Sequence, residues 1–217
     1  DGRWENRTNC AEAKRIVQLL QNFFLTRKEN ETVGIISFNV SQRDLISDLI
    51  DDAAAQDPAF AAAVNRESKR KDNGEDVGLF VKNIESVQGD ERDVIIFSIG
   101  YAKNTEGKLV QRFGWLNARG GENRLNVAIS RAKKKIYIVT SFEPEELNVD
   151  GLKSEGPRIL KKYLQYARAI SDGNTAVAQS ILNSFGAAPP RDAAEAASSS
   201  AVMDRVYNAL VRKGYTI

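Results

Sequence analysis

The sequence contains no histidine and a single cysteine, Cys10. These absences argue against an ordinary zinc site and against a Ser-His-Asp or Cys-His nucleophile. One cysteine also excludes a disulfide within the chain and is typical of a reducing compartment. The sequence has no secretory signal peptide and no apolar run of about 18 residues, so it predicts a soluble, cytoplasmic protein.

Basic and acidic residues are nearly equal in number. Lys and Arg number 31 against 29 Asp and Glu, which leaves a net charge of +2. This balance neither requires nor excludes a nucleic-acid partner. Hydrophobic residues make up 42% of the 217 positions, enough for a folded core. Because the chain begins without Met and stops at "GYTI", we expect it to be a piece of a longer protein.

Short apolar runs alternate with segments of helical periodicity. The runs are typical of strands buried on both faces, and they cover residues 32–38, 78–84, 94–100 and 135–141. Helices are predicted from Asn9, which caps the first with Glu12 at its third position, from Ser41 as the cap of the second, and after Pro58. Further helices are predicted over residues 122–133, 155–170 and 175–185, and a surface loop over 65–76. This alternation predicts a parallel, doubly wound sheet.

Composition also suggests where the chain divides. We predict one α/β domain over residues 1–150, a helical extension over 151–185 and an Ala-, Ser- and Pro-rich linker over 186–200. Residues 201–217 are predicted to begin a second domain that is cut short.

The segment "NRLNVAISRAKKKIYIVTS" raises a specific question about two arginines. On a helix over residues 122–133, Arg124 and Arg131 lie about 20° apart around the axis, at the margin of an apolar stripe. An arginine there is half covered and can reach across a cleft. Taken by itself, Arg131 could equally be a solvated helix residue.

Ligands of parallel sheets gather at the carboxyl ends of the strands. We expect three segments at that edge: "SFNVSQ" after the first strand, "ESVQGDERD" after the second, and the loop that enters the helix containing Arg124.

Three of these stretches resemble motifs of superfamily 1 helicases. "VGIISFNVSQRDLI" resembles motif IV, "IESVQGDERDVIIFS" motif V and "RLNVAISRAKKKIYIVTS" motif VI, in the family's order. The resemblance covers roughly residues 9–141. It is greatest to a bacterial branch of helicase-related proteins in which the second motor domain precedes a restriction-endonuclease-like domain. It therefore implies a RecA-like, three-layer fold of the P-loop NTPase superfamily.

The resemblance also implies a role for each matching residue. Arg131 matches the arginine finger that contacts the γ-phosphate of ATP, and Arg124 the second arginine of the motif. Gly89 allows a tight turn, Glu91 accepts a hydrogen bond from the ribose, and Gln88 couples this loop to the nucleic acid. Ser37 and Asn83 match positions that hold the nucleic-acid backbone, where Asn83 departs from the family's usual hydroxyl. Phe38-Asn39 replaces the usual Pro-Tyr.

Other parts of such a motor are missing from this sequence. It contains no GxxxxGK[ST] phosphate loop and no strand that ends in an acidic pair for Mg²⁺. We expect ATP and Mg²⁺ to be used by the whole protein, bound with the first RecA-like domain, and this chain alone to be inactive. Single-stranded nucleic acid, expected to be DNA, is the other predicted partner.

Other interpretations of these residues and of the whole chain stay open. Glu91 could merely pair with Arg92, and Ser37 and Asn83 could cap the next helix. The fold could serve as a non-catalytic scaffold for a partner, or the chain could itself be a nuclease.

Overall fold

The computed structural model describes residues 2–27 and 30–185. The predicted linker over 186–200 and the truncated domain over 201–217 lie outside the described residues. The helices are α1 Cys10–Thr26, α2 Val40–Gln56, α3 Pro58–Ser68, α4 Gly121–Ile129, α5 Glu155–Ser171 and α6 Thr175–Phe185. The main strands are β3 Val33–Ser37, β6 Phe80–Asn83, β7 Arg92–Ser98 and β10 Ala132–Val139. Two-residue strands form three hairpins: β1 Trp4–Glu5 with β2 Thr8–Asn9, β4 Lys71–Asp72 with β5 Glu75–Asp76, and β8 Ala102–Lys103 with β9 Leu109–Val110.

The chain divides into two compact units. The first lies within Asp1–Gln111 and Arg131–Phe142 and contains the sheet; the second lies within Arg112–Ser130 and Glu143–Ile217. The domain boundaries expected from the sequence stay a prediction.

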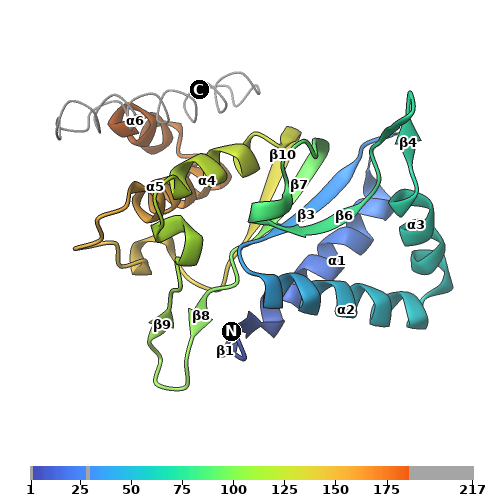
Figure 1. The fold of residues 1–217 in the computed structure, drawn as a ribbon, viewed down its shortest axis with the longest axis horizontal. Helices are drawn as coiled ribbons and strands as arrows, with labels where there is room; N and C mark the ends of the chain where they lie inside the picture. The colour runs from blue at the N-terminus through green and yellow to red at the C-terminus, as the bar shows by residue number, and fades with distance from the viewer. Residues whose placement is uncertain (1, 28–29, 186–217) are drawn as a thin grey trace. The chain divides into compact units, whose positions relative to one another are not determined.

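All four main strands of the first unit are parallel, in the spatial order β10-β7-β3-β6 (Figure 1). Every residue of β3 is buried, as the apolar run predicts for a central strand. The predicted α/β fold, a parallel sheet flanked by helices, is confirmed.

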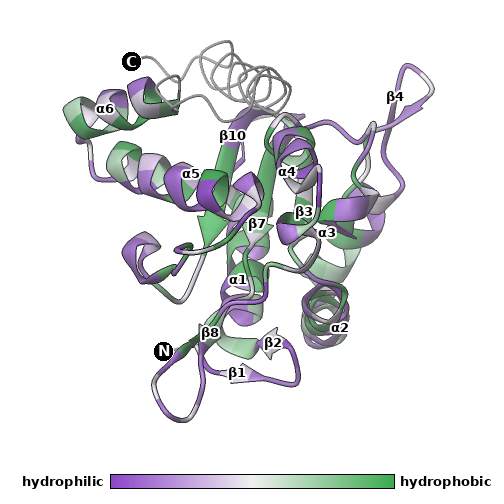
Figure 2. Ribbon diagram, turned by 60° about the vertical axis from the view of Figure 1, so that its left-hand side comes forward, coloured by the Kyte–Doolittle hydropathy of each residue, from purple (hydrophilic) through white to green (hydrophobic). Residues whose placement is uncertain are grey.

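Helices α1 and α2 cover one face of this sheet, and α3 packs against α2. Ile16 and Leu20 of α1 and Ile46 of α2 are fully buried there against Ile35 of β3. Figure 2 shows the hydrophobic colouring concentrated on the strands and on one side of α1. Alternate residues of the strands, such as Ile36 and Phe97, are buried on the opposite face.

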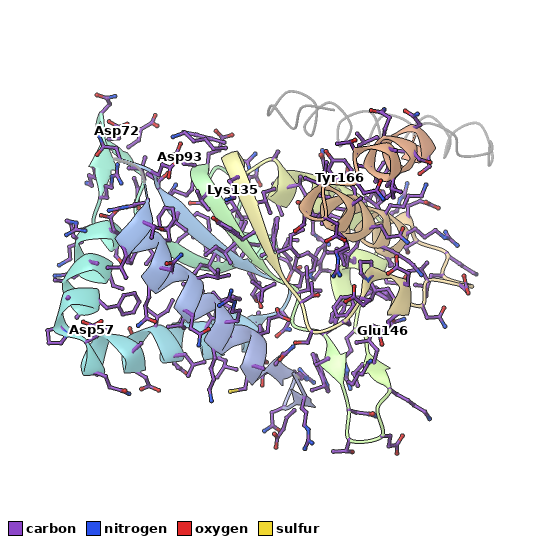
Figure 3. The ribbon with its side chains drawn as sticks, turned by 180° about the vertical axis from the view of Figure 1, so that it is seen from behind. Asp57, Asp72, Asp93, Lys135, Glu146 and Tyr166 are labelled. Carbon is purple, nitrogen blue, oxygen red and sulfur yellow. The ribbon has the colours of Figure 1, made fainter. Side chains whose placement is uncertain are left out.

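Asparagine caps begin both long helices of this unit. Asn9 caps α1 as predicted, since its side-chain oxygen accepts from the amide of Glu12. The prediction that Ser41 caps the second helix was wrong. Helix α2 starts after Asn39, whose Oδ1 accepts a hydrogen bond from the Gln42 amide at 2.8 Å. Asn and Ser cap equally well, so spacing alone did not distinguish Asn39 from Ser41. Asp57, labelled in Figure 3, begins α3 by accepting from the amides of Ala59 and Phe60.

The predicted surface loop over residues 65–76 is only partly a loop. Its first residues complete α3, and β4 and β5 form a hairpin. Asn73 and Gly74 at its tip have φ of 49° and 87°. Asn-Gly is the dipeptide most typical of such a hairpin turn. It could have predicted the hairpin in a segment that its polar composition assigns to a loop.

In the second unit, α5 contacts α4, α6 and the 3-10 turn Gly114–Asn117. Gly121 is the first residue of α4 and Gly156 the second residue of α5, and an added Cβ at either would lie 2.3 Å from the carbonyl oxygen of Leu116. The buried side of α5 includes Ile159, Leu160, Tyr163 and Leu164, and α6 has the predicted bounds.

Candidate functional site

The residues singled out from the sequence lie at both ends of the parallel strands. Ser37 and Asn83 end β3 and β6 and are partners in register. Glu91 precedes β7 and Arg131 precedes β10, so both lie at the amino edge. We expected residues 85–93 at the carboxyl edge. The segment begins there and ends at the opposite edge, because β7 runs parallel to β3 and must start where β3 starts.

Arg131 does not belong to a helix. Helix α4 ends at Ile129 with Ser130 as its cap, and Ala132 already pairs with Arg92 in the sheet. The Arg131 carbonyl accepts from the Arg92 amide at 3.0 Å instead of continuing the helix. Strand pairing has overridden the helical pattern of the sequence, so the predicted helix over 122–133 is too long. The prediction that Arg124 and Arg131 lie along one margin of the same helix is therefore wrong.

Arg124 is exposed on α4 and belongs to the second compact unit, whereas Arg131 belongs to the first. The buried side of α4 includes Leu125, Ala128 and Ile129. Ala132, which the helical pattern would place on the same stripe, lies in β10. The role of Arg124 at a nucleotide stays a prediction.

The structure brings Glu91 and Arg131 together. Their closest atoms, Glu91 Oε1 and Arg131 Nη1, are 3.9 Å apart, and the side chains are 49% and 16% exposed. An ion pair of this length and exposure contributes little to folding. The half-exposed Glu91 carboxylate can therefore turn to a ligand with little loss from this pair.

The turn that carries Glu91 is fixed at several points. Gly89 has a φ of 88°, and an added Cβ there would meet no atom within 4 Å, so its backbone conformation is what requires glycine. Asp90 forms a 2.8 Å ion pair with Lys82 of β6, and Val87 is buried. Gln88 is exposed next to the glycine.

The lysines at the start of β10 have different neighbours. Lys134 lies 3.1 Å from Asp93 and 3.8 Å from Glu31, and these two carboxylates raise its pKa above the usual value. Asp93 also accepts hydrogen bonds from the amide and hydroxyl of Thr32. Lys135 lies over the Tyr137 ring. The register of β10 against β7 shifts between Ala132 and Lys135, and consecutive residues of a strand point to opposite faces of the sheet.

At the carboxyl edge, Ser37 has no exposed surface. Its hydroxyl donates to the Asn39 carbonyl and accepts from the Asn39 amide at 3.3 Å, within the turn that starts α2. Asn83 is 7% exposed and accepts from the Ser86 hydroxyl at 2.7 Å. These are local backbone and turn contacts, and the expected contacts with nucleic acid stay a prediction.

Sequence reasoning missed a buried polar network at this edge. The carboxylate of Glu12 accepts from the Ser98 hydroxyl at 2.6 Å and the Gly100 amide at 2.8 Å. Gln42 donates to Ser98, and Asn9 donates to Ser141, so the network connects α1 and α2 to the ends of β7 and β10. Burial raises the pKa of Glu12 to about 8, although these hydrogen bonds oppose the shift. The capping pattern located Glu12 but could not show that its carboxylate turns inward.

Within residues 2–27 and 30–185, no group of three or more His, Cys, Asp or Glu side chains is placed to hold a metal ion. Over the same ranges, no helix combines the length and hydrophobicity needed to cross a membrane.

The parallel sheet and its flanking helices have the form of a RecA-like helicase domain. A family model described as an AAA domain matches residues 1–143, and the chain belongs to this family. Three relatives are similar over most of the chain.

An uncharacterised ATP-dependent helicase of Mycoplasma genitalium is 43% identical over 171 residues, which are 79% of this chain and 14% of that protein. A homologous Mycoplasma pneumoniae protein is 41% identical over 172 residues, 79% of this chain and 15% of its own length. A Saccharomyces cerevisiae protein, named as a candidate ATP-dependent RNA helicase, is 32% identical over 154 residues, 63% of this chain and 13% of its own. The chain thus spans about a seventh of the length of each relative that it matches.

Proposed function

We propose that this chain is the second motor domain of an ATP-dependent superfamily 1 helicase or translocase, and that Arg131 is its arginine finger. The observation that carries the proposal is the approach of Arg131 to Glu91 at the amino edge of β7 and β10. These are the two side chains that the motif resemblance assigns to one nucleotide. Names of ATP-dependent helicases among the relatives support the same reading.

The two residues would perform different tasks on ATP. Glu91 would accept a hydrogen bond from the ribose, since a half-exposed carboxylate is a good acceptor. Arg131 would direct a bidentate guanidinium at the transferred phosphoryl group, where such a residue accelerates reaction by about 10³–10⁵, or roughly 4–7 kcal/mol of barrier. Gly89 and the Lys82–Asp90 pair would hold the turn in place.

This chain fits only half of the nucleotide site. It has an arginine and a ribose acceptor but no phosphate loop, and its described residues hold no cluster of metal ligands. When bound, Mg²⁺ and ATP supply the reacting phosphate and its bridging charge. We propose that the first RecA-like domain of the same protein holds them and that this chain alone does not hydrolyse ATP.

Nucleic acid would bind at the other end of the strands. Ser37 and Asn83 lie in register and buried at the carboxyl edge, where their turn contacts would shape the loops that meet the polymer. The exposed Gln88 lies on the segment that runs from this edge to Glu91. That segment would transmit nucleic-acid binding to the nucleotide. We propose single-stranded DNA as the track; because one relative is named for RNA, the test includes both polymers.

Arg131→Ala in the intact protein tests the proposal. We expect nucleic-acid-stimulated ATP hydrolysis to fall by about 10³-fold or more, whereas Arg15→Ala leaves it unchanged. Arg15 is an exposed residue of α1 whose guanidinium contacts Gln18 on the same helix. Wild-type activity of Arg131→Ala would reject the motor assignment and favour the scaffold alternative.

A further inference from the structure

Arg92 is a buried charge that the motif resemblance does not explain. It is 3% exposed at the start of β7, between the turn carrying Glu91 and the strand that follows Arg131. Burial lowers the pKa of its guanidinium, while the charges of Asp76 and Asp90 act in the opposite direction. An arginine stays protonated even so.

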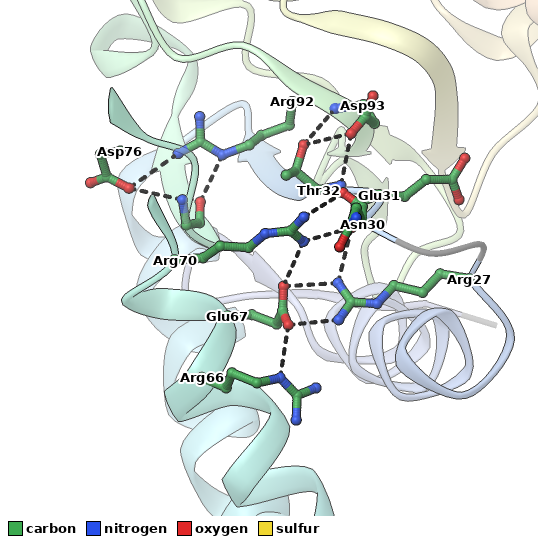
Figure 4. A network of polar contacts seen from close by, with 11 residues as sticks. Arg27, Asn30, Glu31, Thr32, Arg66, Glu67, Arg70, Asp76, Arg92 and Asp93 are labelled. Carbon is green, nitrogen blue, oxygen red and sulfur yellow. Dashed lines mark hydrogen bonds and ion pairs between the residues drawn. The ribbon is translucent and has the colours of Figure 1, made fainter. Parts of the chain in front are cut away.

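The side chain of Arg92 crosses the sheet to a fixed set of partners. Its Nε donates to the Gly78 carbonyl at 2.7 Å, and Nη2 lies 3.7 Å from Asp76 on the β4–β5 hairpin (Figure 4). Its guanidinium stacks 5.0 Å from the centre of the Phe80 ring. That ring lies against Gly34 of β3, where an added Cβ would be 2.3 Å from it. The guanidinium is therefore held between a backbone carbonyl and an aromatic ring.

From this position Arg92 contacts the backbone of both proposed nucleotide residues. Its Nη1 donates to the Glu91 carbonyl at 2.8 Å, and its own amide donates to the Arg131 carbonyl at 3.0 Å. One residue therefore fixes Glu91 through its side chain and Arg131 through its main chain.

We propose that Arg92 is a positioning residue, which sets the separation and direction of Glu91 and Arg131 at the nucleotide. The proposal rests on the proposed function. A well-packed apolar side chain could fill the same space without burying a charge, so simple packing does not account for an arginine here. A lysine could keep the charge, but it lacks the fork that reaches two carbonyls at once.

The test is a double-substitution cycle in the intact protein, with single-stranded DNA or RNA as the stimulating polymer. We expect Arg92→Lys to lower the kcat of ATP hydrolysis by about 100-fold, the loss typical of a misplaced catalytic group. In a Glu91→Ala background the same change should lower kcat by less than about threefold, because the side chain of Arg92 acts through Glu91 and residues that act as a unit are not additive. Arg92→Met provides the same comparison if the lysine variant does not fold.

Arg66→Lys is the matched control. Arg66 is 65% exposed and pairs with Glu67 in the neighbouring network, and it touches neither Glu91 nor Arg131 in any described contact. We expect its kcat to match wild type.

The outcomes separate the two proposals. Full activity of Arg131→Ala would reject the proposed function. Loss of activity in Arg131→Ala together with normal activity in Arg92→Lys would overturn only the positioning role. An equal fold-loss from Arg92→Lys in both backgrounds would also overturn it, because a general structural defect reduces both enzymes alike.

Discussion

Glu12, in the first turn of α1, accepts a 2.6 Å hydrogen bond from Ser98 at the carboxyl end of β7, and both side chains are buried. The bond connects the first helix of the chain to a central strand. It also places a carboxylate where ionisation is disfavoured.

Stability should therefore depend on the protonation of Glu12. The folded pKa is about 8, above the ordinary value of 4.5, so the folded state binds the proton more tightly. This contribution is fully present below pH 4.5 and is lost as pH rises through about 8, a change on the order of a few kcal/mol. Chemical denaturation of the 217-residue chain should show this fall between pH 5 and 8.5, and Glu12→Gln should flatten it. An unchanged slope in the Gln variant would show that Glu12 is not responsible.

Glu67 should give the opposite pH dependence. Arg27 donates to both of its oxygens, at 2.8 and 2.6 Å, and this bidentate contact lowers the pKa of Glu67 to about 2 (Figure 4). The stabilisation is present above pH 4.5 and is lost as pH falls through about 2. We expect Glu67→Gln to destabilise the chain at pH 7 by about 1–3 kcal/mol and to weaken its acid sensitivity. Acid denaturation followed by circular dichroism would measure both, and equal sensitivity in the two proteins would contradict the prediction.

A substitution at Gly89 tests the effect of its backbone conformation alone, because an added methyl group would meet no neighbouring atom. Gly89→Ala should cost about 1 kcal/mol of stability through its positive φ, and it should also lower ATP hydrolysis because the turn carries Glu91. Gly74→Ala is the matched control, since Gly74 has a φ of 87° and equally open surroundings on the β4–β5 hairpin. The two variants should lose similar stability, measured by thermal unfolding, but only Gly89→Ala should lose activity. Equal activity in both would remove the turn from the proposed site.

Gly34 is required for a different reason, the close approach of the Phe80 ring. Gly34→Ala should cost about 1–3 kcal/mol, because the new methyl group forces the ring to move. In a Phe80→Leu background the same change should cost less, since the smaller side chain leaves room. The free energies of unfolding of the four proteins test this coupling, and strictly additive losses would contradict it.

The sequence predicted those parts of the fold that depend on local chemistry. Asn9 as a cap, the buried strand β3 and the bounds of α6 follow from side-chain pattern and capping. The errors arose where strand pairing decided the structure. Arg131 left the predicted helix because Ala132 pairs with Arg92, a partner distant in sequence that no local window reveals.

The candidate site shows the same division. Motif spacing identified Glu91 and Arg131, but only the parallel register places them at one edge and Ser37 at the other. The role proposed for Arg92 depends on contacts with Gly78 and Phe80, which come from a different strand. Such contacts leave no signature at the position of the arginine itself.

The most direct test of the central claim is a structure of the intact protein with Mg²⁺ and a non-hydrolysable ATP analogue. The account predicts that the Arg131 guanidinium lies within hydrogen-bonding distance of the γ-phosphate, about 2.7–3.2 Å, with the Glu91 carboxylate at the ribose. An Arg131 side chain directed away from the bound triphosphate would contradict the account.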